Sequence, residues 1–231
     1  MPKRLEGLET RLLDAAVRLL GERGLPGMTV RNVALAADVS YGGPVARFGD
    51  ERGLLAAVAE RGFRLLEQGL AAAPSSATPR TFTTLRPSAV NTLGLRYVEF
   101  ALTHRHLHRA MHHSDLWTHT PVRKPASPSI ARRDAKSAGW LARAAAARDA
   151  CFARFVAAAV ADQMAGRVAD GSPGEIARVV TALSDGFILQ TSDAAAGAPA
   201  GLERQLAVAE RIFGWAQAGL EPKDRGSGRR E

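Results

Sequence analysis

The chain has 231 residues, of which 46% are apolar and 23% charged, and these values are typical of a soluble globular protein. It has one cysteine, Cys151, so an intrachain disulfide is excluded. Its apolar runs are too short for a membrane span, and its first residues lack the apolar core of a signal peptide. We therefore expect a cytoplasmic protein with no membrane contact.

The net charge of +8 favours a polyanionic partner but does not locate one. Through Arg52 there are eight lysines and arginines against seven acids, so the excess lies later, notably between Arg123 and Arg148. Alanine is abundant and β-branched runs are scarce, a composition that favours helix because alanine loses no side-chain entropy there. The sequence predicts an all-α fold of about nine helices.

The first fifty residues predict three helices. Apolar residues recur at three- and four-residue spacing over 5–19, and Gly24 with the nearby Pro26 ends this helix. Thr29 is a typical N-cap for a short second helix, and Ser40 for a short third one. A longer helix follows from about residue 50. Two short helices joined by a tight turn are typical of a helix-turn-helix unit. Periodicity alone is equally compatible with a simple helical subdomain.

The rest of the chain alternates predicted helices with breaks. Residues 73–87 and 114–128 are rich in Pro, Ser and Thr and read as loops. A long Ala-rich helix or helix pair is expected over 130–168, and two closing helices over 174–196 and 200–219. The apolar stripes of the closing helices exceed one internal face, which predicts a homodimer through this pair.

The N-terminal part of the chain, through Phe63, resembles a known family in specific residues. The similar segments are Leu12-Leu13-Asp14-Ala15-Ala16, Gly24, Thr29-Val30-Arg31-Asn32-Val33-Ala34 and Ala37-Asp38-Val39-Ser40, continuing through Gly42, Pro44, Phe48, Leu54, Leu55, Val58, Gly62 and Phe63. Together they resemble the DNA-binding head of TetR-family transcriptional regulators. More weakly, Arg96–Leu102 and His106–Met111 are similar to the family's C-terminal domain of the WHG type.

The resemblance implies a head over residues 1–50, with a fourth helix from about 50 connecting it to a helical-bundle ligand-binding and dimerisation domain over 51–220. Residues 221–231 are expected to be a disordered tail. The implied function is a transcriptional regulator that binds double-stranded operator DNA and responds to a small, apolar molecule. By analogy with the family, it would be a repressor released by that effector, with no enzymatic activity and no cofactor.

Nine residues are the candidate DNA contacts. The hydroxyls of the caps can also meet a phosphate, an arginine can bind phosphate or guanine, and glycines allow close backbone approach. Where the family usually has Tyr, a basic residue and His, this chain has Val45, Ala46 and Arg47, and a frequent family Lys aligns with Glu51. These departures predict modest affinity or unusual specificity. The candidates are Thr29, Arg31, Ser40, Tyr41, Gly42, Gly43, Val45, Arg47 and Arg52.

All six histidines fall between His104 and His119, and His104, His108 and His112 are spaced by four. That spacing suits a metal ion, but polar-face residues beside a ligand pocket are the commoner case, so no metal is expected. Each candidate pocket residue could equally be plain core. The candidates are Phe100, His104, His108, Met111, Trp117, Trp140, Phe152, Phe155 and Phe187.

Two other functions remain open from the sequence. The first is a helical protein that binds a small molecule or a metal and whose degenerate head no longer binds DNA. The atypical residues Val45, Ala46 and Glu51 support this alternative. The second is a metal-dependent enzyme that uses the histidines. The sequence has no phosphate-binding Gly-rich loop, nucleophile elbow or His-Glu-x-x-His motif to support it.

Overall fold

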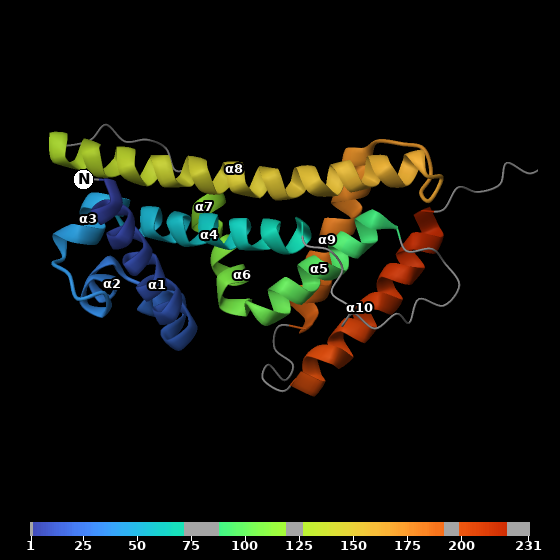
Figure 1. Cartoon of the computed structure of the whole chain (residues 1–231), viewed down its shortest axis with the longest axis horizontal. Helices are drawn as coiled ribbons and strands as arrows, with labels where there is room; N and C mark the ends of the chain where they lie inside the picture. Colours follow the sequence, from blue (N-terminus) through green and yellow to red (C-terminus); the bar gives the residue numbers. More distant parts are fainter. Residues whose placement is uncertain (1, 72–87, 119–126, 192–198, 221–231) are drawn as a thin grey trace, which may run out of the picture. The chain divides into compact units, whose positions relative to one another are not determined.

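The computed structural model describes residues 2–71, 88–118, 127–191 and 199–220, and these residues form ten helices with no strand among them (Figure 1). The all-α prediction is confirmed, and one helix beyond the nine expected is a single turn, α7. The helices are α1 (Pro2–Gly27), α2 (Val30–Ala36), α3 (Gly42–Phe48), α4 (Glu51–Ala71), α5 (Ala89–Thr103), α6 (Arg105–Met111), α7 (Ser114–Trp117), α8 (Pro128–Met164), α9 (Pro173–Thr191) and α10 (Pro199–Leu220).

The chain divides into two compact units. Unit 1 comprises Met1–Glu67 and His104–Ala150, and unit 2 comprises Gln68–Thr103 and Cys151–Glu231. Unit 1 therefore holds α1–α3, most of α4, α6, α7 and the first part of α8, and α4 and α8 contribute residues to both units. The functional boundary near residue 50 stays a prediction. None of the described helices is long and apolar enough to cross a membrane.

The core of unit 1 supports two helices of seven residues each, α2 and α3. Helices this short are marginal alone, so tertiary packing must supply their stability. Leu12 of α1, Val33 of α2, Phe48 of α3 and Leu54 of α4 are each fully buried. The apolar stripe of α1 that the sequence predicts is thus the surface on which the short helices rest.

Local signals set most helix ends in this unit. Gly24 has φ 67° and breaks α1, as predicted. Thr29 caps α2, since its Oγ1 accepts a hydrogen bond from the Asn32 amide at 3.1 Å. Asp50 does the same for α4, accepting from the Gly53 amide at 2.8 Å. The predicted cap at Ser40 is wrong: α3 begins at Gly42, and Tyr41 is the N-cap, without a side-chain hydrogen bond.

In unit 2, α5 lies alongside both α9 and α10 (Figure 1). Gly94 permits this packing, because a Cβ there would lie 2.4 Å from the Phe213 ring. The first turn of α5 is capped by a long-range group, the fully buried Asp162 of α8. Its two carboxylate oxygens accept from the amides of Ala89 and Val90 at 2.9 and 2.8 Å, and Arg167 neutralises the charge at 2.7 Å.

Two expectations about the later helices need correction. The Ala-rich segment is one helix, α8, which ends at Met164 because Gly166, with φ 65°, interrupts it before Val168. Residues 114–117, expected in a loop, form α7, in which His113 Nδ1 accepts from the Asp115 amide at 3.3 Å. The predicted loop over 73–87, most of the loop over 114–128 and the tail over 221–231 lie outside the described residues.

Candidate nucleic-acid interface

A tight turn joins α2 to α3. Asp38 has φ 52°, a left-handed conformation that short polar side chains tolerate, and the Val39 amide donates to the Ala34 carbonyl at 3.0 Å. The Gly43 amide then donates to the Ser40 carbonyl at 2.9 Å, which begins the next helix. The two short helices and this turn form the helix-turn-helix that the sequence predicts.

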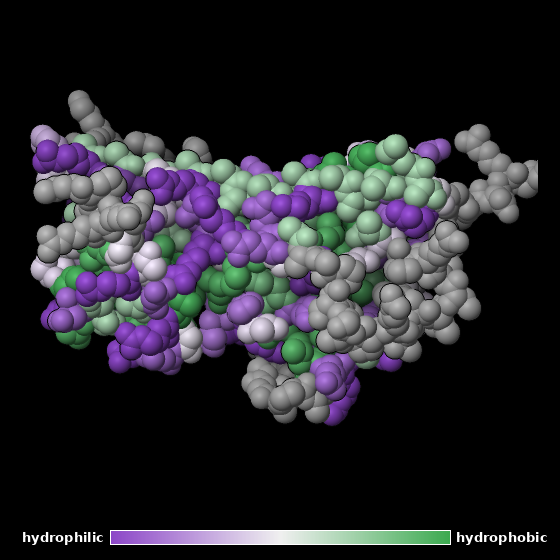
Figure 2. Space-filling view, viewed as in Figure 1, coloured by the Kyte–Doolittle hydropathy of each residue, from purple (hydrophilic) through white to green (hydrophobic). Residues whose placement is uncertain are grey.

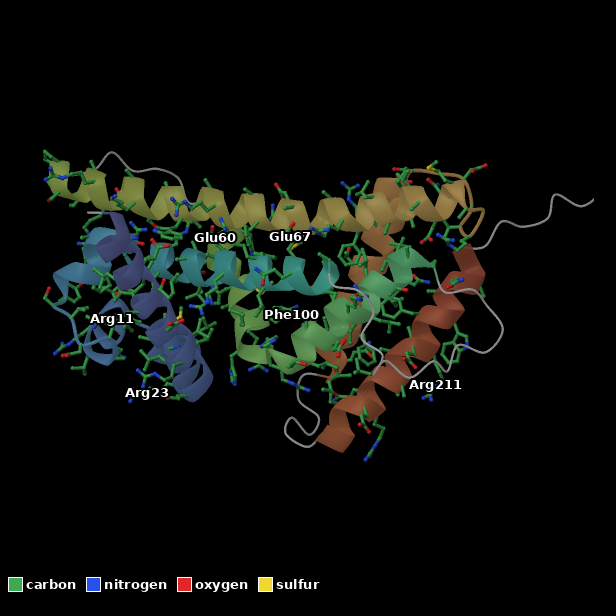
Figure 3. The ribbon with its side chains drawn as sticks, in the orientation of Figure 1. Arg11, Arg23, Glu60, Glu67, Phe100 and Arg211 are labelled. Carbon is green, nitrogen blue, oxygen red and sulfur yellow. The ribbon has the colours of Figure 1, made fainter. Side chains whose placement is uncertain are left out.

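Two arginines of α1 hold the end of α2. Arg11 donates to the Ala37 carbonyl at 2.7 Å, and Arg18 donates to the Ala36 carbonyl at 3.1 Å (Arg11 is labelled in Figure 3). Cations at a helix C-terminus stabilise both its unpaired carbonyls and its dipole. Sequence reasoning missed these residues, although their seven-residue spacing places them on one face of α1.

Most of the predicted DNA contacts cluster at the start of α2 and around the turn. Arg31, Ser40 and Gly42 are exposed, and Tyr41 exposes 55% of its surface, which is unusual for an aromatic residue. Thr29, Gly43 and Val45 are half-buried. The structure thus brings seven of the nine candidates to the N-terminal ends of the two short helices, where base-reading residues of such motifs lie.

The remaining two candidates have partners inside unit 1. Arg47, in the last turn of α3, forms an ion pair with Glu9 of α1. Arg52, in the first turn of α4, donates from Nε to the Asp115 carbonyl at 2.9 Å and from a terminal nitrogen to the Thr118 carbonyl at 3.1 Å. These guanidinium groups therefore join helices within unit 1, and any DNA contact of theirs stays a prediction.

The first part of α8 braces the turn between α3 and α4. Trp140 Nε1 donates to the Arg47 carbonyl at 3.1 Å, and its ring packs on Phe48 with centroids 5.5 Å apart. Ser137 Oγ donates to Asp50 Oδ1 at 2.8 Å, and Arg133 Nε donates to the Gly49 carbonyl at 3.1 Å. Three residues of one α8 face thus fix the end of the helix that would read DNA.

The predicted pocket residues are divided between the two units. His104, His108, Met111, Trp117 and Trp140 belong to unit 1, and Trp140 among them packs against α3 instead. The others belong to unit 2, where Tyr97 and Phe155 pack edge to face with centroids 6.5 Å apart. The unit 2 candidates are Phe100, Phe152, Phe155 and Phe187.

Around α6 and α7, an aromatic cluster surrounds Phe63 of α4. The Phe63 ring lies edge-on to His112 and to Trp117, at 6.0 and 6.1 Å between centroids. Trp117 Nε1 donates to the carbonyl of Met111 at 3.0 Å. Met111 is fully buried and approaches Gly62 so closely that a Cβ there would lie 2.6 Å from its sulfur. This cluster connects α7 to the middle of α4.

His104 precedes α6 as its N-cap and His112 follows it as its C-cap, so His108 alone of the three spaced histidines lies within the helix. The rings of His108 and His112 stack with centroids 4.3 Å apart. Burial and, to a smaller extent, the electrostatic effect of the neighbouring His112 together lower the pKa of His108 to about 3. His108 is therefore neutral at ordinary pH, and its metal binding stays a hypothesis.

Unit 1 also contains a cavity of about 500 Å³. Its walls come from the α1–α2 junction, the start of α4, and α7 with its flanking residues. The cavity adjoins Thr29, a candidate DNA contact, and Arg52, which bonds to Asp115 of α7 and to Thr118 directly after this helix. The lining residues are Leu25, Pro26, Met28, Thr29, Glu51, Arg52, Leu55, His113, Asp115 and Thr118.

Comparison with known proteins agrees with this geometry. The sequence model of the family described as bacterial regulatory proteins, tetR family, matches residues 12–58, which span α1 to the first part of α4. No curated protein matches the chain significantly.

Several solved structures are similar over nearly the whole chain. A protein of unknown function from Rhodococcus sp. RHA1 is 27% identical, with a TM-score of 0.63 over 93% of this chain and 96% of that one. A regulatory protein in the tetR family from Rhodococcus RHA1 is 17% identical, with a TM-score of 0.62 over 94% and 98%. SmeT of Stenotrophomonas maltophilia, in complex with triclosan, is 19% identical, with a TM-score of 0.54 over 97% and 98%. These likenesses support the same fold.

Proposed function

We propose that the chain, whose residues 12–58 match the tetR family of bacterial regulatory proteins, is a DNA-binding transcriptional repressor that a small molecule releases from operator DNA. The observation that carries this proposal is the braced helix-turn-helix, whose exposed residues gather at the N-terminal ends of α2 and α3. A scaffold that holds two seven-residue helices from three sides is expected where their outer surface must dock rigidly.

For DNA binding, we assign the main contacts to the start of α2 and the turn before α3. Arg31 can bind a phosphate or the acceptor edge of a guanine, and Tyr41 can contact a phosphate or a thymine methyl group. Gly42 and Gly43 follow Tyr41, and because they have no side chains, the backbone at the start of α3 can approach a groove of the DNA closely. Arg47 and Arg52 take a smaller share, because Glu9 pairs with Arg47, and the carbonyls of Asp115 and Thr118 accept hydrogen bonds from Arg52.

For effector binding, we propose the cavity of unit 1 as the site. Its volume of about 500 Å³ lies within the range of small-molecule pockets. An occupant would touch α7 and the residues next to Thr29, and the Arg52 bonds to the Asp115 and Thr118 carbonyls would transmit a shift of α7 to the start of α4. Release requires only that the effector bind the two states of the head with different affinity, typically by about 1–3 kcal/mol. A triclosan complex of the similar SmeT supports a small-molecule effector.

For assembly, we propose a homodimer through α9 and α10. Both helices expose large apolar side chains that monomeric proteins usually cover: Val179, Leu189 and Trp215 are 51%, 77% and 72% exposed. A dimer would supply two heads, the number that an operator read in two successive major grooves requires.

Binding of the protein to the intergenic DNA upstream of its own gene tests the proposal. The wild type should bind this DNA in preference to a scrambled duplex, and Arg31→Ala with Tyr41→Ala should abolish the preference. Arg64→Ala, at an exposed arginine of α4, is the control and should keep it. Folded, dimeric protein that shows no preference at low salt would contradict the proposal and indicate a head that no longer binds DNA.

The effector is tested separately by screening small molecules for thermal stabilisation of the protein and for release of DNA. Arg52→Ala should keep the stabilisation by a hit compound while losing much of the release. If no compound that binds the protein changes DNA binding, the repressor is not ligand-responsive.

A further inference from the structure

The first part of α8 carries a basic stripe beside the end of α3. Arg132, Lys136 and Arg143 are exposed and spaced by four and seven residues, so they share one face of the helix. Asp134, two residues from Arg132 and from Lys136, lies about half a turn away from that face. Figure 2 shows hydrophilic residues gathered over this N-terminal end of α8.

The stripe borders a depression of about 140 Å³ that it shares with the last turn of α3. Arg143 stacks on Trp140, with its Cζ 4.6 Å from the ring centroid, and the Arg47 Cζ lies 6.0 Å from the same centroid. Gly139 leaves the middle of the depression open, because a Cβ there would meet nothing within 4 Å. The depression is lined by Arg47, Ala135, Lys136, Gly139, Trp140 and Arg143.

We propose that this basic stripe binds the phosphate backbone of DNA that flanks the bases read by α3. The inference rests on the proposed function and adds a second contact surface to it. A lysine offers a point charge and an arginine a bidentate fork for a phosphate. Lys136 and Arg143 line the depression and Arg132 lies one turn before Lys136, an arrangement that suits a single strand segment. Glu9 takes part of the charge of Arg47 by pairing with it, and Lys136 and Arg143 remain as the other cations of the depression.

The brace of α8 makes the stripe a fixed part of the head. Trp140, Ser137 and Arg133 of α8 donate hydrogen bonds to the α3–α4 turn. These bonds fix the position of the stripe relative to α3. A phosphate contact on such a brace positions the helix without reading sequence. The residues of the head are nearly neutral in sum, and the basic excess of the chain lies in the segment that forms the first part of α8. The stripe therefore supplies positive charge that the head lacks.

The test compares the salt dependence of DNA binding for the wild type and for Arg132→Gln with Lys136→Gln, on the upstream DNA and on a scrambled duplex of equal length. Each lost phosphate contact should lower the slope of log affinity against log salt by about 1, and the affinity about tenfold at 0.1 M salt. Both DNAs should lose affinity by the same factor. The charge-matched control is Arg64→Gln with Arg154→Gln, which should change neither quantity.

The outcomes separate the two proposals. If the wild type prefers its upstream DNA and the stripe variant binds with an unchanged slope, the stripe does not contact DNA, while the proposed function stands. If only the upstream DNA loses affinity, the stripe reads bases and the phosphate assignment is wrong. If the wild type binds neither DNA, both proposals fail. Circular dichroism melting of the variant checks its fold, and Lys136→Arg, which keeps the charge, should bind as the wild type does.

Discussion

Thr29 begins α2 and closes the α1–α2 junction at the same point. Its Oγ1 accepts from the Asn32 amide at 3.1 Å, and the Asn32 side chain donates back to the Gly27 carbonyl at 3.0 Å. The two bonds satisfy an otherwise unpaired helix amide and a carbonyl of the preceding turn. Thr29 is half-buried and also borders the cavity of unit 1, so one residue serves helix capping, a candidate DNA contact and the proposed effector site.

Thr29→Ala should lower the free energy of unfolding by about 1 kcal/mol, because the Asn32 amide loses its acceptor. Thr29→Ser keeps the hydroxyl and should retain most of the stability. Urea unfolding followed by circular dichroism measures both. Equal losses in the two variants would show that packing of the methyl group, and not the cap, is what matters.

At the scale of elements, the α3–α4 turn depends on a helix far away in the sequence. Asp50 uses the same carboxylate oxygen to cap α4 through the Gly53 amide and to accept from Ser137 of α8, each at 2.8 Å. Gly49, with φ 89°, allows the approach, because a Cβ there would lie 2.3 Å from the Arg133 carbonyl. The C-terminal end of α3 is therefore positioned jointly by α4 and α8.

Asp50→Ala removes both hydrogen bonds and should lower the free energy of unfolding by about 1–3 kcal/mol. Ser137→Ala leaves the cap intact and should cost less, about 1 kcal/mol. Chemical unfolding of the two variants gives the comparison, with Asp134→Ala, an exposed acid of α8, as a control expected to stay within about 0.5 kcal/mol. Equal stability of Asp50→Ala and the control would mean that the turn is held by packing alone.

For the whole molecule, dimerisation would bring together the helix-turn-helix units of two chains. One chain carries one helix-turn-helix, whereas an operator read in two successive grooves requires two. The exposed apolar residues of α9 and α10 are the described surface best suited to supply that symmetry, because burying such residues releases water from apolar area.

Leu189→Glu with Trp215→Glu should convert the dimer to a monomer, because each places a charge where apolar surface would be buried. Sedimentation velocity at micromolar concentration measures the change, and DNA affinity should fall with it. Met164→Glu, at an apolar residue of α8 that is 87% exposed, is the matched control and should leave the dimer intact. A wild type that is already monomeric would rule out this interface.

Features that depend on a few neighbouring residues could be predicted from the sequence. The all-α class follows from composition, and the break at Gly24 and the cap at Thr29 follow from backbone and side-chain chemistry that acts over three residues. The family pattern of the head is likewise a local arrangement of residue types. The predicted cap at Ser40 was wrong, because α3 begins at Gly42 and Tyr41 takes the N-cap position without a side-chain hydrogen bond.

The long-range partners of the site residues became known from the folded structure. Trp140, a predicted pocket residue, packs on Phe48 and donates to the Arg47 carbonyl across 93 positions of the sequence. Arg52, a predicted DNA contact, donates to the carbonyls of Asp115 in α7 and of Thr118 directly after it. Periodicity shows which face of a helix is buried but not what it is buried against, because that choice depends on packing between segments far apart in the chain.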